Sequence, residues 1–418
     1  MNYTYITTKT LTQKKFFISN ELLFSTIAMM WALNFFIAET LNVYELGSVT
    51  YLFYIVIYSF GFLAWGRALF KKPCLVIPLL MGISMVLLLS FMFNQHVIDV
   101  FFNFGSGGIG EIAQSNFAIL FGLCLPLVLL SQLRMDFGCL TRYLYRYSII
   151  NILLFSFTMF IQIFIMPQTI NYMTLAYAAI PSIFIAVAYG YIHKLKVPII
   201  LSLVGMFFML LGGSRGAILT LAIFIFFVLM YYFKSNKNTK KFIILLLLLI
   251  ITIFIAIYFY EIIQYLCDWL EGFGYSSRLI EKILDQSMDG NIFEFSDRAE
   301  ILENSIEHIG TFGKGVYGDW VINGGVYSHN FIIEILVQYG IVLGALILLL
   351  FVLFLIYTVK KSFRQKNSFL RFMQFAFFAV LLGKMMVSSS YLIDQAFWLF
   401  ISMMCLIYNK RICVIGEN

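Results

Sequence analysis

A histidine stands where a long polar stretch gives way to an apolar one, in the order Tyr327, Ser328, His329, Asn330. Its imidazole titrates near neutrality, so it can take a proton from a hydroxyl group. Glu334 lies five residues further on, where it can orient a ring nitrogen, and Asn330 is a second support. The pattern predicts a general base. A histidine with a purely structural role at this boundary is the alternative.

Arg215 lies in the glycine-rich run 212–216, directly before an apolar stretch. Ser214 can cap a helix there, and the free N–H groups at a helix start attract anions. A guanidinium adds paired donors that suit phosphate. The run predicts a phosphate site, and an arginine that snorkels from a tight interfacial turn is the alternative.

Three further cations stand at unusual places. Arg278 and Arg298 begin two amphipathic segments, where the helix dipole disfavours positive charge. Phosphate would explain both, and ordinary salt bridges to the many nearby acids would do so equally. Lys384 lies within an apolar run, where a cation costs ~3 kcal/mol or more in a membrane and usually faces a cavity or a partner. Snorkelling to the interface is its alternative.

The amino-acid composition of the chain indicates what kind of secondary structure carries these residues. The chain has 418 residues, of which 61% are hydrophobic and 12% charged. That is far more apolar than a soluble domain, and a water-facing globule could not bury it. The six cysteines form no CxxC pair, and no HExxH or Asp-x-Asp motif occurs, so no metal site is predicted. Composition therefore predicts an all-α integral membrane protein.

Apolar stretches of about 20 residues predict about twelve transmembrane helices. The expected spans are 18–38, 48–66, 74–93, 114–133, 147–166, 174–192, 197–212, 215–233, 242–260, 334–357, 370–390 and 393–409.

The basic residues test this count. With both termini cytoplasmic, 22 of the 28 Lys and Arg residues fall on the cytoplasmic side, as the positive-inside rule requires. The six left are Arg215, Arg278, Lys282, Arg298, Lys314 and Lys384. The net charge of +7 is thus explained by topology, and nucleic acid is not expected as a partner.

One connection is too long to be a simple turn. Residues 1–260 hold spans one to nine, residues 261–328 form a large outer loop with twelve acidic residues, and residues 329–418 hold the last three spans. Apolar spacing predicts amphipathic helices at 277–286 and 297–309 within the loop. The glycine-rich run 310–315 follows no strand and is interpreted as a turn.

In this order the motifs resemble those of the O-antigen ligase and Wzy-type O-antigen polymerase superfamily. The resemblance covers about 205–350. It rests on the Ser-Arg-Gly turn at 214–216, Asp-Arg-Ala-Glu-Ile-Leu at 297–302, Phe-Gly-Lys-Gly at 312–315, and the run from His329 to Gly344.

The resemblance implies a GT-C-like, inverting glycosyltransferase of the bacterial inner membrane with its active site on the periplasmic face. Its donor and acceptor would be glycans on undecaprenyl pyrophosphate, without metal or other cofactor. Membrane lipid and a chain-length regulator protein are the implied partners. Arg215 and Arg298, with Arg278, would bind pyrophosphate, His329 would be the base, and Glu334, Asn330 and Lys384 would support them.

The turn 313–315, the run 327–330 and the aromatic-rich first half favour a polymerase. An O-antigen ligase, which transfers the lipid-linked glycan to lipid A core, is the alternative. A lipid-linked oligosaccharide flippase is an alternative of another class, although transporters usually carry several intramembrane charges and short loops. Trp320 and Tyr327 are candidate sugar contacts.

Overall fold

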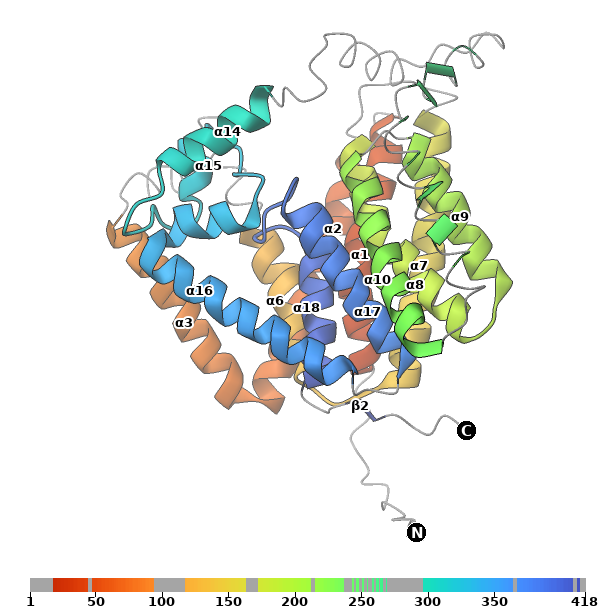
Figure 1. Cartoon of the computed structure of the whole chain (residues 1–418). Helices are drawn as coiled ribbons and strands as arrows, with labels where there is room; N and C mark the ends of the chain where they lie inside the picture. The colour runs from red at the N-terminus through yellow and green to blue at the C-terminus, as the bar shows by residue number, and fades with distance from the viewer. Residues whose placement is uncertain are drawn as a thin grey trace, which may run out of the picture.

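The computed structural model describes residues 18–43, 47–93, 117–162, 172–211, 215–236, 296–363, 367–408 and 412–413, with single positions between 243 and 268. Almost all of this is helical (Figure 1). The α-helices are α1 (Asn20–Val43), α2 (Gly47–Lys71), α3 (Pro73–Phe93), α6 (Leu125–Ser131), α7 (Phe137–Phe160), α8 (Tyr172–Ile192), α9 (Lys196–Leu211), α10 (Arg215–Asn236), α14 (Ser296–Glu307), α15 (Gly318–Ile322), α16 (Phe331–Phe363), α17 (Ser368–Ala379) and α18 (Gln395–Tyr408). Two π-helical segments, η1 (Leu120–Cys124) and η3 (Val380–Met385), adjoin α6 and α17.

Helices lie at eleven of the twelve predicted spans, in agreement with an all-α membrane protein. The predicted ninth span, 242–260, falls where only single positions are described, so the number twelve stays a prediction. In the part of the chain that the structure describes, five helices are long and apolar enough to cross a membrane: Asn20–Leu41, Phe53–Lys71, Thr174–Ile192, Phe331–Lys361 and Ser368–Met385. Five shorter apolar helices accompany them.

Helix α7 contains most of the predicted fifth span, 147–166, and extends beyond it on the N-terminal side. Helix α7 starts ten residues earlier, at Phe137, because Asp136 caps it by accepting a hydrogen bond from the backbone N–H of Cys139 at 2.7 Å. Arg142 and Arg146, which the positive-inside rule assigns to the cytoplasmic side, lie in these first helical turns.

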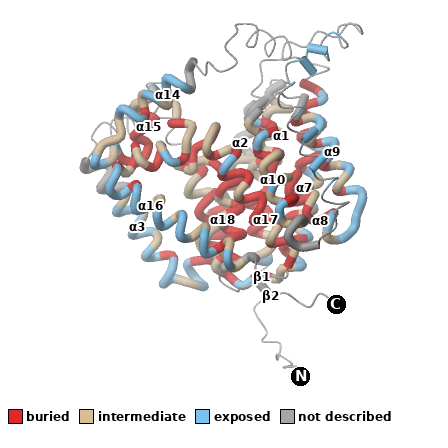
Figure 2. The backbone as a smooth tube through the Cα atoms, in the orientation of Figure 1, coloured by how far each residue is buried: buried red, intermediate tan, exposed pale blue. Residues whose placement is uncertain are grey.

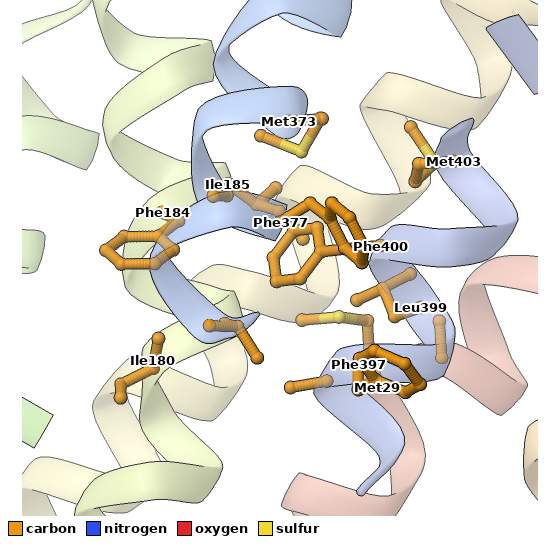
Figure 3. Close-up of a cluster of buried hydrophobic side chains, with 14 of the residues drawn as sticks. Met29, Ile180, Phe184, Ile185, Met373, Phe377, Phe397, Leu399, Phe400 and Met403 are labelled. Carbon is orange, nitrogen blue, oxygen red and sulfur yellow. The ribbon is translucent and has the colours of Figure 1, made fainter. Parts of the chain in front are cut away.

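The core lies between α1, α8, α17 and α18, which cross the middle of the bundle (Figure 2). Phe184 on α8, Phe377 on α17 and Phe400 on α18 are fully buried there, in a cluster of isoleucine, methionine and phenylalanine side chains (Figure 3). Helix α16 differs, since about half of its apolar side chains are exposed and few are fully buried. So large an exposed apolar surface suits lipid rather than water.

One end of the bundle gathers basic residues. The short strands β1 (Met135–Asp136) and β2 (Ile412–Cys413) pair in parallel there. Asn20 donates to the Arg134 carbonyl at 2.9 Å, and Arg67 donates to Asn20 at 3.2 Å. Helices α14 and α15 lie at the opposite end in Figure 1. The second predicted loop helix thus has a counterpart in α14, whereas the first, 277–286, lies outside the described residues.

Helix α16 bends near its start, at Gly340, whose φ of 74° is accessible mainly to glycine. The turn 310–315 packs against the bend: Lys314 donates its N–H to Val337 at 2.8 Å, and Gly315 donates to Gln338 at 2.9 Å. The glycine-rich run is therefore a turn in the structure, and it holds the first part of α16 at a fixed angle.

Candidate functional site

A cavity of about 450 Å³ opens between α1, α8, the segment before α16 and the start of α18. Its polar lining includes Tyr327, His329, Lys384 and Asp394, and Trp31 on α1 adds an aromatic wall. The volume and the mixture of apolar walls with few polar groups are typical of small-ligand sites.

His329 enters this cavity from a constrained backbone. Its φ of 55° is unusual for a residue with a side chain. The Tyr327 ring lies 4.3 Å from the imidazole, centroid to centroid, and the Tyr327 hydroxyl donates to the Ser388 carbonyl at 2.9 Å. Asn330 caps α16, since its side-chain oxygen accepts from the N–H groups of Ile332 and Ile333 at 3.0 and 3.2 Å. Its amide also donates to the Met386 carbonyl at 3.3 Å.

Lys384 projects into the same cavity from η3. It forms an ion pair with Asp394, and its ammonium lies 5.0 Å from the centroid of the Tyr177 ring. The Lys384 side chain is 13% exposed and the Asp394 side chain is fully buried. Asp394 also accepts from the Ser389 hydroxyl at 2.6 Å and from the Phe397 N–H at 2.8 Å, which caps α18.

Next to the cavity lies a second polar cluster, which we call the closed network: Asp319, Ser328, Glu334, Gln338, Ser390 and Tyr391. Asp319 on α15 accepts from the N–H and hydroxyl of Ser328 at 3.1 and 3.2 Å. Gln338 donates to Asp319 at 2.7 Å and to Glu334 at 3.4 Å. Both carboxylates are fully buried.

The other donors to Glu334 come from the η3–α18 turn, residues 386–394. The Ser390 hydroxyl and the Tyr391 N–H both donate to it, the latter at 3.3 Å. Glu334 therefore joins α16 to this turn. Its predicted role of orienting the His329 ring stays a prediction.

Burial raises the pKa of the Asp319 carboxyl from 3.8 to about 6, although the hydrogen bonds from Gln338 and Ser328 partly oppose the rise. Burial also raises the pKa of the neighbouring Tyr317 hydroxyl, and the charges of Glu334 and Asp319 add to that rise. Both shifts mark this cluster as dry and tightly packed.

The structure describes the three predicted pyrophosphate-binding arginines only in part. Arg215 is the first residue of α10. The next residue, Gly216, packs so closely on the Tyr177 hydroxyl that a Cβ there would clash, so α10 begins beside the cavity. Arg298 lies in the first turn of α14, and Arg278 lies outside the described residues.

Helix α14 is fixed to α15, because Asn304 donates to the Ile322 carbonyl at 3.2 Å and Asn323 donates to the Ser305 hydroxyl at 2.8 Å.

Among the described residues no three His, Cys, Asp or Glu side chains gather as metal ligands would.

Residues 197–348 match the O-antigen ligase family. The match supports the superfamily that the sequence motifs resemble, and it includes Arg215, Arg298, His329 and Glu334. No curated protein and no solved structure gave a match.

The O-antigen ligase match ends before Lys384 and begins after Tyr177, so other parts of the chain complete the cavity. Of the predicted residues, the structure brings His329 and Lys384 into one cavity, with the start of α10 beside it. Tyr327 lines the cavity, whereas Trp320 is only 5% exposed and packs against Tyr317.

No sequence pattern pointed to a role for Asp319, and the sequence placed Asp394 in the polar stretch after Lys384 without identifying it as the partner of that lysine. A signal for the closed network was present, since Glu334 and Gln338 are four residues apart and so share one face of α16.

Proposed function

We propose that the protein is an O-antigen polymerase: an inverting, metal-independent glycosyltransferase of the bacterial inner membrane. It joins oligosaccharide repeat units carried on undecaprenyl pyrophosphate at the periplasmic face. The observation that carries the proposal is the shared cavity of His329 and Lys384, beside the start of α10, in a chain whose residues 197–348 match the O-antigen ligase family.

In the proposed reaction an acceptor hydroxyl attacks the anomeric carbon of the donor glycan. A new carbon–oxygen bond forms as the bond from that carbon to the pyrophosphate oxygen breaks, which inverts the anomeric configuration. His329 takes the hydroxyl proton, and the electron pair leaves with undecaprenyl pyrophosphate. Arg215 and Arg298, with Arg278, would stabilise the negative charge that grows on the leaving group.

The distribution of charge supports the proposed orientation. The end with Arg67 and Arg134 would be cytoplasmic, together with both termini, by the positive-inside rule. The end with α14 and α15 would then be periplasmic (Figure 1). On this orientation the cavity receives its substrates after they have been moved across the membrane.

The same features support an O-antigen ligase, because both enzymes would use the same donor and the same base. They differ only in the acceptor, which is a second lipid-linked glycan or lipid A core. The description of the matched family favours the ligase, and the first-half composition and the sequence 327–330 favour the polymerase.

Deletion of the gene in its host separates these functions on a lipopolysaccharide gel. We expect core with a single repeat unit and no ladder. Bare core with long lipid-linked chains accumulating outside would instead identify a ligase. Bare core with single lipid-linked repeats retained inside would rule out both enzymes and leave a flippase.

Arg298→Ala tests the flippase separately. If Arg298 stabilises the leaving group, complementation with this variant restores membrane-inserted protein without the ladder, and the lipid-linked repeats accumulate at the periplasmic face. Repeats accumulating at the cytoplasmic face would contradict the enzyme. The matched control is Lys360→Ala, which removes an exposed charge at the far end of α16.

A further inference from the structure

The ion pair of Lys384 and Asp394 is built from irregular backbone. Lys384 belongs to η3, a π-helical segment that interrupts the end of the helix begun by α17. Such interruptions redirect side chains and are frequent at functional sites. Gly383 packs on Thr220 of α10 so closely that any side chain would clash, which places η3 against the helix that starts at Arg215.

Lys384 and Asp394 differ in the hydrogen-bond partners that each has besides the other. Asp394 keeps two further donors, the Ser389 hydroxyl and the Phe397 N–H, and its carboxylate is fully buried. Lys384 is partly exposed to the cavity, and its ammonium has three N–H donors, of which an ion pair to one carboxylate oxygen uses one. Asp394 would therefore remain hydrogen-bonded if Lys384 turned away, and Lys384 has donors left for a second partner.

The remaining surroundings of Lys384 also suit an anion. Its second contact is the face of the Tyr177 ring, which attracts a cation without neutralising it. Asp394 is the one acidic side chain among the residues that line the described cavity. An anionic group that enters next to His329 would thus share the described cavity with the Lys384 ammonium.

We infer that Lys384 is an anion-binding residue, whose ammonium binds a phosphoryl group of the ligand non-covalently. Between turnovers the same ammonium pairs with Asp394. The inference rests on the proposed function for the identity of the ligand, which is the pyrophosphate of the lipid-linked donor. It assigns the cavity wall formed by η3, outside the O-antigen ligase match, to recognition of the leaving group.

A purely structural role for Lys384 predicts something different. Lys384 would then only neutralise the buried carboxylate, and removal of both charges together would restore the protein. The decisive variant is therefore the double change Lys384→Met with Asp394→Asn, which leaves no buried charge uncompensated and keeps the shapes of both side chains.

The experiment measures thermal unfolding of the purified full-length protein in detergent as inorganic pyrophosphate, or undecaprenyl pyrophosphate in mixed micelles, is added. We expect both to raise the Tm of the wild-type protein. The double variant should need about tenfold more ligand for the same rise, since one charge-assisted hydrogen bond is lost. Lys384→Arg should respond nearly as the wild type does, and Lys360→Met, which removes an exposed lysine, should match it.

Three results would overturn the inference: a double variant that responds as the wild type does, a wild-type protein that responds to neither ligand, and an equal Lys384-dependent response to phosphatidylglycerol micelles. The last result would assign the site to ordinary lipid headgroups. These outcomes are independent of the gel that tests the polymerase, because ligand-dependent unfolding is measured without any glycan transfer.

Discussion

The cavity and the closed network are neighbours built from the same two segments, yet they treat polar groups in opposite ways. In the segment before α16, His329 lines the cavity while Ser328 donates to Asp319 in the network. In the η3–α18 turn, Ser389 serves the cavity side and Ser390 the network. Successive residues of each segment thus face different environments.

The two regions differ in how exposed their charged side chains are and in how fully these side chains are hydrogen-bonded. In the network, Asp319 and Glu334 are fully enclosed and accept hydrogen bonds from neutral donors in three parts of the chain: the segment before α16, α16 itself and the η3–α18 turn. In the cavity, Lys384 retains exposure and His329 has a backbone conformation that costs free energy. An enclosed cluster suits a scaffold, and an open one with a constrained histidine suits chemistry.

The largest expected effect is a loss of activity on substitution of His329, which lines the cavity and not the closed network. His329→Asn keeps a residue that tolerates positive φ but removes the imidazole that we propose as the base. We expect glycan transfer to fall about a thousandfold or more, while the Tm stays near that of the wild type. The measurement is polymer formed by purified protein from lipid-linked repeats that were extracted from the deletion strain.

His329→Ala is the comparison for that variant, because it adds backbone strain of about 1 kcal/mol to the loss of the base. A His329→Asn protein that still polymerises at a tenth of the wild-type rate would show that the imidazole is part of the fold and not the base.

Substitution of Asp319, in the closed network, should mainly lower the stability of the folded protein. Asp319→Ala leaves the Ser328 N–H, the Ser328 hydroxyl and the Gln338 amide without their buried acceptor. We expect a loss of about 4 kcal/mol in the free energy of unfolding, measured as a lower Tm in detergent. Asp319→Asn keeps the shape and one acceptor oxygen, so its loss should be smaller. Normal melting combined with lost transfer would assign Asp319 to the cavity instead.

The pKa of Asp319 makes the network sensitive to pH. In the folded chain it is about 6, against an ordinary value of 3.8. Between these values the folded chain holds a proton that the unfolded chain has released, so the free energy of unfolding falls as the pH rises from about 4 to about 6. The total is up to about 3 kcal/mol. Tm values from pH 4 to pH 8 test this.

Asp319→Asn is the control for that pH series, because histidines titrate over part of the same range and remain in the variant. The difference between the two curves isolates Asp319. Parallel curves would mean that the carboxyl keeps its ordinary pKa.

Much of this comparison was readable from the sequence, because lipid imposes simple rules. Apolar runs of membrane length located the helices, as α8 and α18 illustrate. Lys384 was singled out because a cation in an apolar run needs a reason, and its partner proved to be Asp394. The ordered motifs pointed to the superfamily whose family model matches residues 197–348, whereas the role of His329 as the base stays a prediction.

The network was not readable, because it depends on contacts between residues distant in the sequence. Glu334 meets Ser390 and Tyr391 more than fifty positions away, and no local pattern reports that contact. The π-helical turn at η3 is likewise set by packing on α10, since its own sequence is that of an ordinary apolar helix. Tertiary contacts, rather than propensity, decide such features.

The smallest expected effect lies at Asn330, which joins the two regions. Its side chain caps α16 on one side and donates to the Met386 carbonyl of the η3–α18 turn on the other. Asn330→Ala should lower the free energy of unfolding by about 1 kcal/mol, the usual worth of a helix cap, and reduce transfer only a few-fold. Asn330→Ser restores the cap but not the contact with Met386, so it should recover the Tm and leave the small loss of activity. If Asn330→Ser recovered both, the contact with Met386 would contribute nothing to the cavity. If Asn330→Ala abolished transfer at an unchanged Tm, Asn330 would have to contact the substrate itself.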